Sequence, residues 1–68
     1  MKITAYVDWD GDLVASDTNE RIRRASSEER RESREELPTG HIHVEVSERT
    51  LRARCPQLMD QMRREGAV

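Results

Sequence analysis

The chain has few large apolar side chains from which to build a core. Its 68 residues include one Trp, one Tyr and no Phe, and 38% of them are charged. The length allows a single domain, residues 1–68. A domain of this size buries about 60% of the surface that its unfolded chain exposes, so its stability is marginal. Such small domains usually need a disulfide, a metal or a partner chain.

A single cysteine, Cys55, excludes an internal disulfide and favours a reducing compartment. Association with itself or with a target is then the remaining source of added stability. No apolar segment is long enough to span a bilayer, and the N-terminus lacks the basic region and apolar core of a signal peptide. We therefore expect a cytoplasmic protein that does not contact a membrane.

Residues 2–17 are expected to form a β-hairpin, because apolar residues alternate on both sides of Asp10-Gly11. An Asp-Gly pair favours a two-residue type I′ turn, which would place Trp9 opposite Asp12 and Val7 opposite Val14. In that register the core face carries Ile3, Ala5, Val7, Trp9 and Val14, and the opposite face carries Thr4, Tyr6, Asp8, Leu13 and Ala15.

Residues 18–36 contain neither Gly nor Pro and are predicted to form one long helix, which ends before Pro38. Asp17 would be its N-cap, with Glu20 in the capping-box position. The half from Glu28 to Glu36 offers nothing to bury and should project into solvent or meet a charged partner. The candidate partner-binding residues are therefore Glu28, Glu29, Arg30, Arg31, Arg34 and Glu35.

His41 to Val46 is predicted to be a third strand that points Ile42, Val44 and Val46 inward. Two interpretations remain for the segment that follows. Apolar residues at helical spacing predict a helix that is kinked or broken at Pro56, which we favour. Alternatively, Arg49 to Arg54 forms a fourth strand, and Pro56 opens a short helix. The residues Leu58, Met59 and Met62 either pack on the sheet or form an oligomer face.

The expected fold class is therefore α+β. A small antiparallel sheet, made of the N-terminal hairpin, a third strand and possibly a fourth, packs with one long charged helix and a C-terminal amphipathic helix. The order along the chain is ββαβα or ββαββα.

The segment from Val7 to Val14 resembles the nucleophile motif of haloacid-dehalogenase-type phosphatases, in which a strand ends in Asp-x-Asp-Gly-Thr. The resemblance implies that Asp8 is a nucleophile and Asp10 an acid/base, both holding Mg²⁺. However, Asp12 replaces the family's Thr, and the chain is too short for the parallel-sheet domain of that family. We interpret the segment as a hairpin turn.

No other cluster makes a convincing catalytic or metal site. The spacing of Asp8, Asp10 and Asp12 does not match an EF-hand loop, because Gly stands fourth rather than sixth. His41 and His43 share a strand face, but two ligands do not make a site unless another group converges. We therefore expect no enzyme activity, no metal and no cofactor.

The net charge of −2 and a pI near 5.6 give no general electrostatic reason to bind nucleic acid. Acidic residues also alternate with most of the arginines, which weakens attraction to phosphates. The sequence favours a non-enzymatic protein-binding regulator or inhibitor, of the kind that phages and other mobile elements encode against host defence complexes. The alternative is a small dimeric nucleic-acid-associated regulator, such as an antitoxin or a transcription accessory protein.

Overall fold

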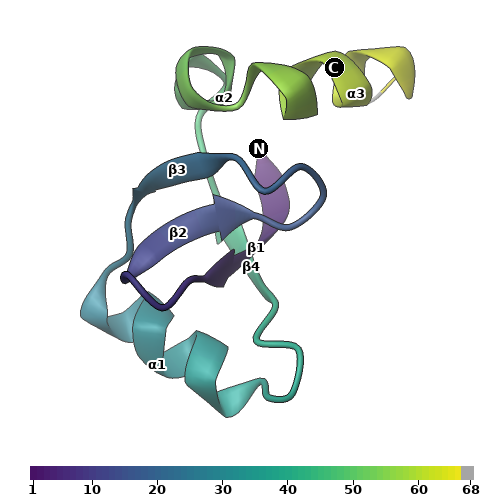
Figure 1. Ribbon diagram of the computed structural model, residues 1–68. Coiled ribbons are helices and arrows are strands. Elements are labelled where there is room, and N and C mark those ends of the chain that lie inside the picture. The colour runs from purple at the N-terminus through teal and green to yellow at the C-terminus, as the bar shows by residue number, and fades with distance from the viewer. Residues whose placement is uncertain (67–68) are drawn as a thin grey trace.

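The computed structural model describes residues 1–66 and shows a four-stranded antiparallel sheet with three helices (Figure 1). The elements follow the order β1 (Lys2–Val7), β2 (Asp12–Ala15), β3 (Arg21–Arg24), α1 (Ser27–Glu35), β4 (Ile42–Glu45), α2 (Glu48–Arg54) and α3 (Pro56–Arg64). The predicted α+β class with an antiparallel sheet is confirmed. None of the described helices has the length and apolar character needed to cross a membrane.

The strands lie side by side in the order β3-β2-β1-β4, so β3 and β4 form the two edges of the sheet. In Figure 1, α1 lies below the sheet, whereas α2 and α3 lie above it. The chain packs α1 against β1 and β4, and α2 against β3. Helix α1 buries only the polar residue Ser33, whereas α2 buries Leu51 and α3 buries Leu58 and Met59. The apolar helical contribution to the core therefore comes from the two C-terminal helices.

One face of the sheet and the two C-terminal helices enclose the core. The sheet and its flanking residues contribute Ile3, Ala5, Leu13, Ala15, Ile22, Ala25, Ile42, Val44 and Val46, and the helices contribute Leu51, Cys55, Leu58 and Met59. The inward side chains of the predicted third strand, Ile42, Val44 and Val46, are buried as expected. Because no aromatic side chain belongs to this cluster, the packing of its aliphatic side chains has to supply most of the stability.

The hairpin forms, but its predicted register was wrong by one residue. Val7 lies opposite Leu13, and Ala5 lies opposite Ala15. Because successive side chains of a strand point to opposite faces, this shift moves Leu13 and Ala15 into the core. It also places Trp9 at the tip of the turn, not in the core face to which the two-residue turn assigned it.

The single helix predicted for residues 18–36 was also wrong, because its first part forms the edge strand β3. Ile22 is buried between exposed arginines, which suits a strand with one buried face. The helix begins later, at Ser27, because Ser26 and Glu29 form a complete capping box. Asp17 therefore caps no helix, and the fourth strand of the sheet lies at Arg21–Arg24 rather than at residues 49–54.

The segment after β4 is a broken helix, as favoured from the sequence. The break lies at Cys55, whose φ of −130° and ψ of 61° are not helical, and Pro56 occupies the first turn of α3. The alternative strand at residues 49–54 was wrong: Leu51 is buried but Ala53 is exposed, whereas a strand would point both inward.

Glu20 connects the hairpin side of the molecule to the start of α3. Its carboxylate accepts hydrogen bonds from the backbone N–H groups of Gln57 (3.0 Å) and Leu58 (2.9 Å) and from the Thr18 hydroxyl (2.7 Å). Burial acts to raise the pKa of Glu20, but these hydrogen bonds outweigh it and the pKa lies below its ordinary value. Glu20 therefore caps α3 from a distant position in the chain.

Replacing Glu20 by alanine should lower the free energy of unfolding by about 1 kcal/mol, because it removes this cap. The Gln variant keeps an oxygen acceptor and should recover part of the loss. Urea unfolding followed by circular dichroism measures both effects. An alanine variant as stable as the parent chain would contradict a capping role for Glu20.

Candidate functional site

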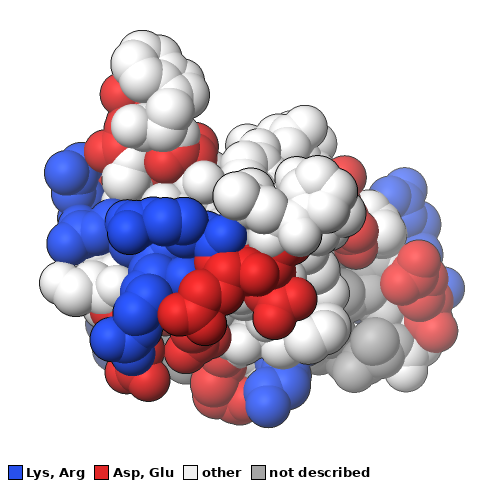
Figure 2. All heavy atoms as spheres, turned by 90° about the horizontal axis from the view of Figure 1, so that it is seen from below, with Lys and Arg blue, Asp and Glu red and all other residues white. Residues whose placement is uncertain are grey.

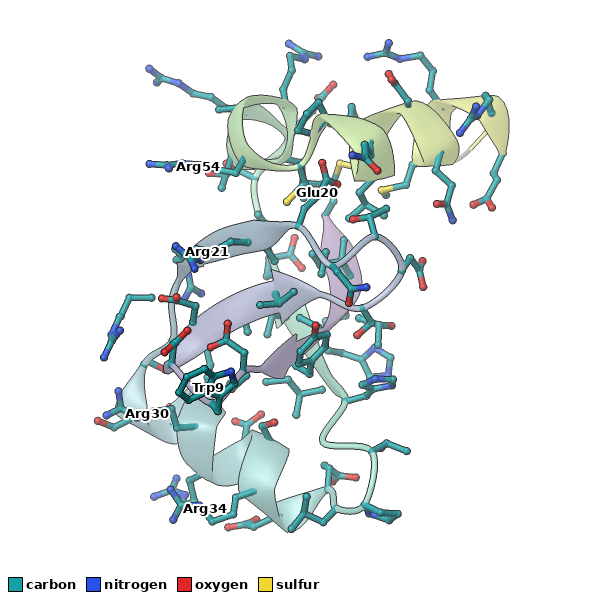
Figure 3. All side chains as sticks on the ribbon, in the orientation of Figure 1. Trp9, Glu20, Arg21, Arg30, Arg34 and Arg54 are labelled. Atoms are coloured by element: carbon teal, nitrogen blue, oxygen red, sulfur yellow. The ribbon has the colours of Figure 1, made fainter. Side chains whose placement is uncertain are left out.

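Trp9 is the most exposed large apolar side chain of the described residues, with 94% of its surface accessible. It stands at the tip of the β1–β2 turn, on the same side of the molecule as Arg30 and Arg34 of α1 (Figure 3). Leu37, just after α1, is 68% exposed. A chain so poor in aromatic residues thus leaves its largest apolar group in solvent.

The turn that presents Trp9 is held by Asp8. One carboxylate oxygen of Asp8 accepts the backbone N–H groups of Asp10 (3.0 Å) and Asp12 (2.9 Å), and the Asp8 carbonyl accepts that of Gly11 (3.0 Å). Gly11 has a φ of +89°, a left-handed conformation that few other residues adopt readily. The three residues between Asp8 and Asp12 therefore form a compact loop that fixes the position of Trp9.

A groove of about 310 Å³ separates this turn from α1. Small and apolar residues line part of it, among them Val7, Gly40 and Leu37, and Arg30 and Arg34 line the side formed by α1. We call Trp9, Arg30, Arg34, Leu37 and the groove that they line the Trp9 surface.

Ser33 ties α1 to the sheet beneath this groove. Its hydroxyl donates to the Gly40 carbonyl (2.6 Å) and accepts the backbone N–H of Val7 (3.4 Å). Gly40 has a φ of +70°, and a Cβ atom there would lie 3.2 Å from the Ser33 hydroxyl oxygen. These two hydrogen bonds, one buried and one partly buried, join α1 to β1 and to Gly40 and so hold the Trp9 surface in shape.

The charges around Trp9 are mixed. Arg34 makes no ion pair within residues 1–66, and Arg30 donates to the Ser27 hydroxyl (3.1 Å) rather than to a carboxylate. Asp10 lies next to Trp9 in the same turn. Figure 2, a view from the α1 side, shows a band of basic side chains directly beside a cluster of acidic ones. Such a surface suits a partner with its own mixed charges better than a uniformly negative phosphate chain.

The structure does not bring the six candidate partner-binding residues onto one surface. Arg30 and Arg34 lie on the Trp9 surface, but Arg31 and Glu35 form an ion pair along the exposed side of α1 (3.9 Å). Glu28 is exposed in the first turn of the helix.

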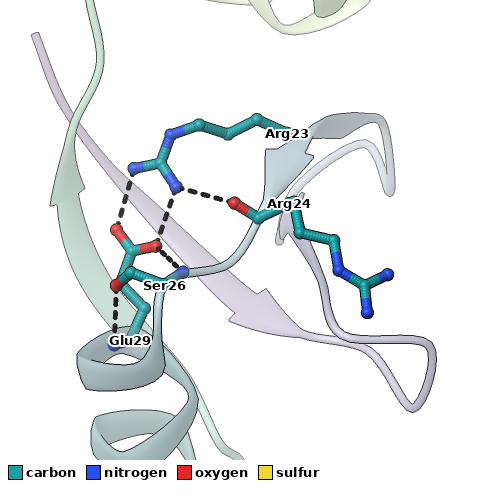
Figure 4. A network of polar contacts seen from close by, with 4 residues as sticks. All are labelled: Arg23, Arg24, Ser26 and Glu29. Atoms are coloured by element: carbon teal, nitrogen blue, oxygen red, sulfur yellow. Dashed lines mark hydrogen bonds and ion pairs between the residues drawn. The ribbon is translucent and has the colours of Figure 1, made fainter.

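Glu29 has a structural role instead, in the network of Figure 4. Its two carboxylate oxygens accept a bidentate pair of hydrogen bonds from Arg23, both 2.8 Å, and one oxygen also accepts the backbone N–H of Ser26 (2.9 Å). The Arg23 guanidinium and these further bonds hold the pKa of Glu29 at about 2. This network fixes the start of α1 to the end of β3.

The candidate oligomer face lies mostly inside the monomer. Leu58 and Met59 are buried in the core, and Met62 is partly buried against it. Cys55 is buried next to them, and burial together with the nearby Glu20 charge raises the pKa of its thiol. The side chains of Leu58 and Met59 therefore contribute to the core rather than to the surface.

The residues of the phosphatase-like segment support the turn. Asp8 is engaged with backbone N–H groups, and Asp12 pairs with Arg21 (3.1 Å) and Arg24 (3.8 Å). The His43 ring lies 3.5 Å from the Thr4 hydroxyl. Within the described part of the chain, no three His, Cys, Asp or Glu side chains converge on a point that could hold a metal ion.

Trp9 and Leu37 were not identified as functional residues from the sequence. A signal for Trp9 was present, because Asp8 followed by Gly11 three residues later is typical of a type I turn closed by a left-handed glycine. That turn is one residue longer than the Asp-Gly turn and carries Trp9 outward.

Comparisons with protein-family models, curated proteins and solved structures found no match to this chain.

Proposed function

We propose that the chain is a protein-binding regulator or inhibitor that anchors its partner through the Trp9 surface. The observation that carries this proposal is the 94% exposure of the only tryptophan, at the tip of a hydrogen-bonded turn. Trp and Arg are the residues most enriched among the energetic centres of protein interfaces, and here Trp9 lies with Arg30 and Arg34. The partner that we propose is a component of a host defence complex, of the kind that phages target.

Trp9 is the largest single source of apolar burial that this surface offers to a partner. A tryptophan buries about 150–250 Å². At about 25 cal/mol per Å², covering Trp9 contributes about 4–6 kcal/mol. The arginines add orientation and faster association more than affinity. An isolated charged helix without this anchor would give much weaker docking.

The test is affinity capture followed by quantitative binding. The baits are the parent chain, Trp9→Ala, Arg34→Glu and the control Arg64→Ala. Each is incubated with lysate of the host cells. Arg64 is an exposed residue of α3, remote from the groove. A partner on the Trp9 surface should be recovered with the parent and the control, lost with Trp9→Ala, and recovered in lower yield with Arg34→Glu.

The recovered partner is then purified and titrated. Trp9→Ala should weaken binding at least about 100-fold, equivalent to about 2.7 kcal/mol. Since Trp9 is the only tryptophan, its fluorescence reports directly on its own burial and should shift to shorter wavelength on binding, provided that the partner's contribution is subtracted. A partner that binds Trp9→Ala as tightly as the parent chain would rule out this surface as its anchor. Recovery of nucleic acid alone would favour the alternative of a nucleic-acid-associated regulator.

A further inference from the structure

A second groove lies at the edge of the sheet, between the edge strand β3 and α2. Its volume is about 660 Å³, roughly twice that of the groove at Trp9. Four arginines line it, Arg21, Arg23 and Arg24 from β3 and Arg54 from α2, with Glu20 as the one acidic side chain in its lining. Figure 3 shows Arg21 and Arg54 projecting toward the same side of the molecule.

The arginines of this groove have more hydrogen-bond donors than their internal partners use. Arg21 and Arg24 share the single carboxylate of Asp12, at 3.1 and 3.8 Å, and remain 67% and 70% exposed. Arg54 makes no ion pair within residues 1–66. Since each guanidinium carries five N–H donors, Arg21, Arg24 and Arg54 retain donors for a ligand.

The acidic residue of the groove is already engaged. Both carboxylate oxygens of Glu20 accept hydrogen bonds at the start of α3, where the helix dipole also favours a negative charge. Arg23 is likewise engaged, through its bidentate pair with Glu29. The groups left to meet a ligand are therefore the guanidinium groups of Arg21, Arg24 and Arg54.

A ligand in this groove is recognised by these side chains rather than by pairing with the strand. Arg23 donates to the backbone carbonyl of Arg24 (3.1 Å), which occupies one acceptor at the end of β3. The pairing of β3 with β2 also shifts register between Leu13 and Val14, an irregularity of the kind that protects edge strands from further pairing. An added peptide strand would therefore meet an irregular edge that carries charged side chains.

We propose that this groove binds a phosphate group. Asp12 offsets one of the two positive charges of Arg21 and Arg24, and Arg54 adds a third arginine, so these three arginines keep a net charge of +2. A terminal phosphate brings up to two negative charges and three acceptor oxygens, and two successive phosphodiester groups of a nucleic acid bring one charge each. Either can take donors from β3 and from Arg54 of α2 at the same time, as bidentate arginine–phosphate contacts do. The Arg24 guanidinium lies beside Gly11 of the turn that presents Trp9, so Arg21 and Arg54 are the arginines that distinguish this site from the Trp9 surface. The phosphate site does not depend on the proposed partner.

The proposal is tested by calorimetric titration of the whole chain in low-salt buffer. The probes are pyrophosphate, a twelve-nucleotide oligothymidylate and citrate, which is a carboxylate of similar charge. The variants are Arg54→Gln and Arg21→Gln, with Arg64→Gln as a matched arginine outside the groove. Thermal unfolding of each variant confirms that it is folded; Arg54 is exposed, so its replacement leaves the core intact.

Pyrophosphate should bind at least tenfold more tightly than citrate, and each groove variant should weaken that binding at least tenfold while Arg64→Gln leaves it unchanged. If the oligonucleotide binds with the same dependence on Arg54 and pyrophosphate does not, the phosphate is that of a nucleic acid backbone. Three results would overturn the proposal: neither phosphate probe binds, citrate binds as tightly as the phosphate probes, or phosphate binding survives both groove variants.

Discussion

Leu13→Ala is expected to lower the free energy of unfolding by about 2–5 kcal/mol, as is typical when a buried leucine is truncated. Trp9→Ala is expected to change it by less than about 0.5 kcal/mol, because exposed side chains contribute little to stability. Leu13 is fully buried in the core cluster, whereas Trp9 is 94% exposed. Although Trp9 is the larger side chain, its truncation should therefore lower the free energy of unfolding less than the truncation of Leu13.

Urea unfolding of both variants, followed by far-ultraviolet circular dichroism, measures these changes directly. A small domain has only a few kcal/mol of stability, so Leu13→Ala should be partly unfolded even without denaturant. The opposite ranking, with Trp9→Ala strongly destabilised and Leu13→Ala nearly neutral, would show that the hairpin has the two-residue turn and its register. The pair of variants thus tests the feature on which the exposure of Trp9 depends.

The hairpin shows where sequence reasoning fails in this chain. Both faces of the predicted hairpin carry apolar residues, so the alternation does not by itself select the register. The choice depends on whether the loop has two residues or three, and the Asp8 side chain decides it by accepting two backbone N–H groups. The position of Trp9, and with it half of the candidate site, follows from that local hydrogen bonding.

The misassigned helix has a different cause. Glu20 was given a local role as a capping-box residue, but its carboxylate caps α3, 37 residues away at Gln57. No pattern within the segment reveals such a long-range partner. Residues 18–24 contain one apolar side chain, Ile22, which cannot define a helical or an alternating period.

Strand β4 was predictable because its pattern is unambiguous, whereas the C-terminal segment was compatible with a helix or a strand and its apolar spacing only favoured the broken helix. Ile42, Val44 and Val46 alternate strictly with polar residues, and Pro56 fits only at the first turn of a helix or at a break. Within the candidate site, Arg30 and Arg34 were selected from the sequence because that half of the helix has nothing to bury. Their proximity to Trp9 arises from the packing of α1 under the turn, which local patterns do not encode.

The second large effect is expected at Glu29, which joins β3 to α1. Glu29→Gln should lower the free energy of unfolding at pH 7 by about 2 kcal/mol, because it replaces charge-assisted hydrogen bonds from Arg23 with weaker neutral ones. The Gln side chain can still accept the Ser26 backbone N–H, so the capping box is retained in part. The loss therefore reports mainly on the pair with Arg23.

The same variant should change how stability depends on pH. The pKa of Glu29 is about 2 in the folded chain, against an ordinary value of 4.5. A carboxylate whose pKa is lowered on folding contributes stability above its unfolded pKa and loses that contribution as the pH falls toward the folded pKa. The difference between the parent chain and Glu29→Gln should thus be complete at pH 7, shrink below about pH 4.5 and be mostly gone near pH 2.

Urea unfolding at several pH values between 7 and 2 measures this difference, with Glu28→Gln as the matched control. Glu28 lies beside Glu29 in the first turn of α1 but makes no ion pair within the described residues, so its replacement should cost only the few tenths of a kcal/mol due to the helix dipole. A Glu29→Gln difference that stays constant or grows on acidification would contradict the assigned network. A difference that shrinks as described would show that one partly buried carboxylate couples the edge strand to the helix that carries Arg30 and Arg34.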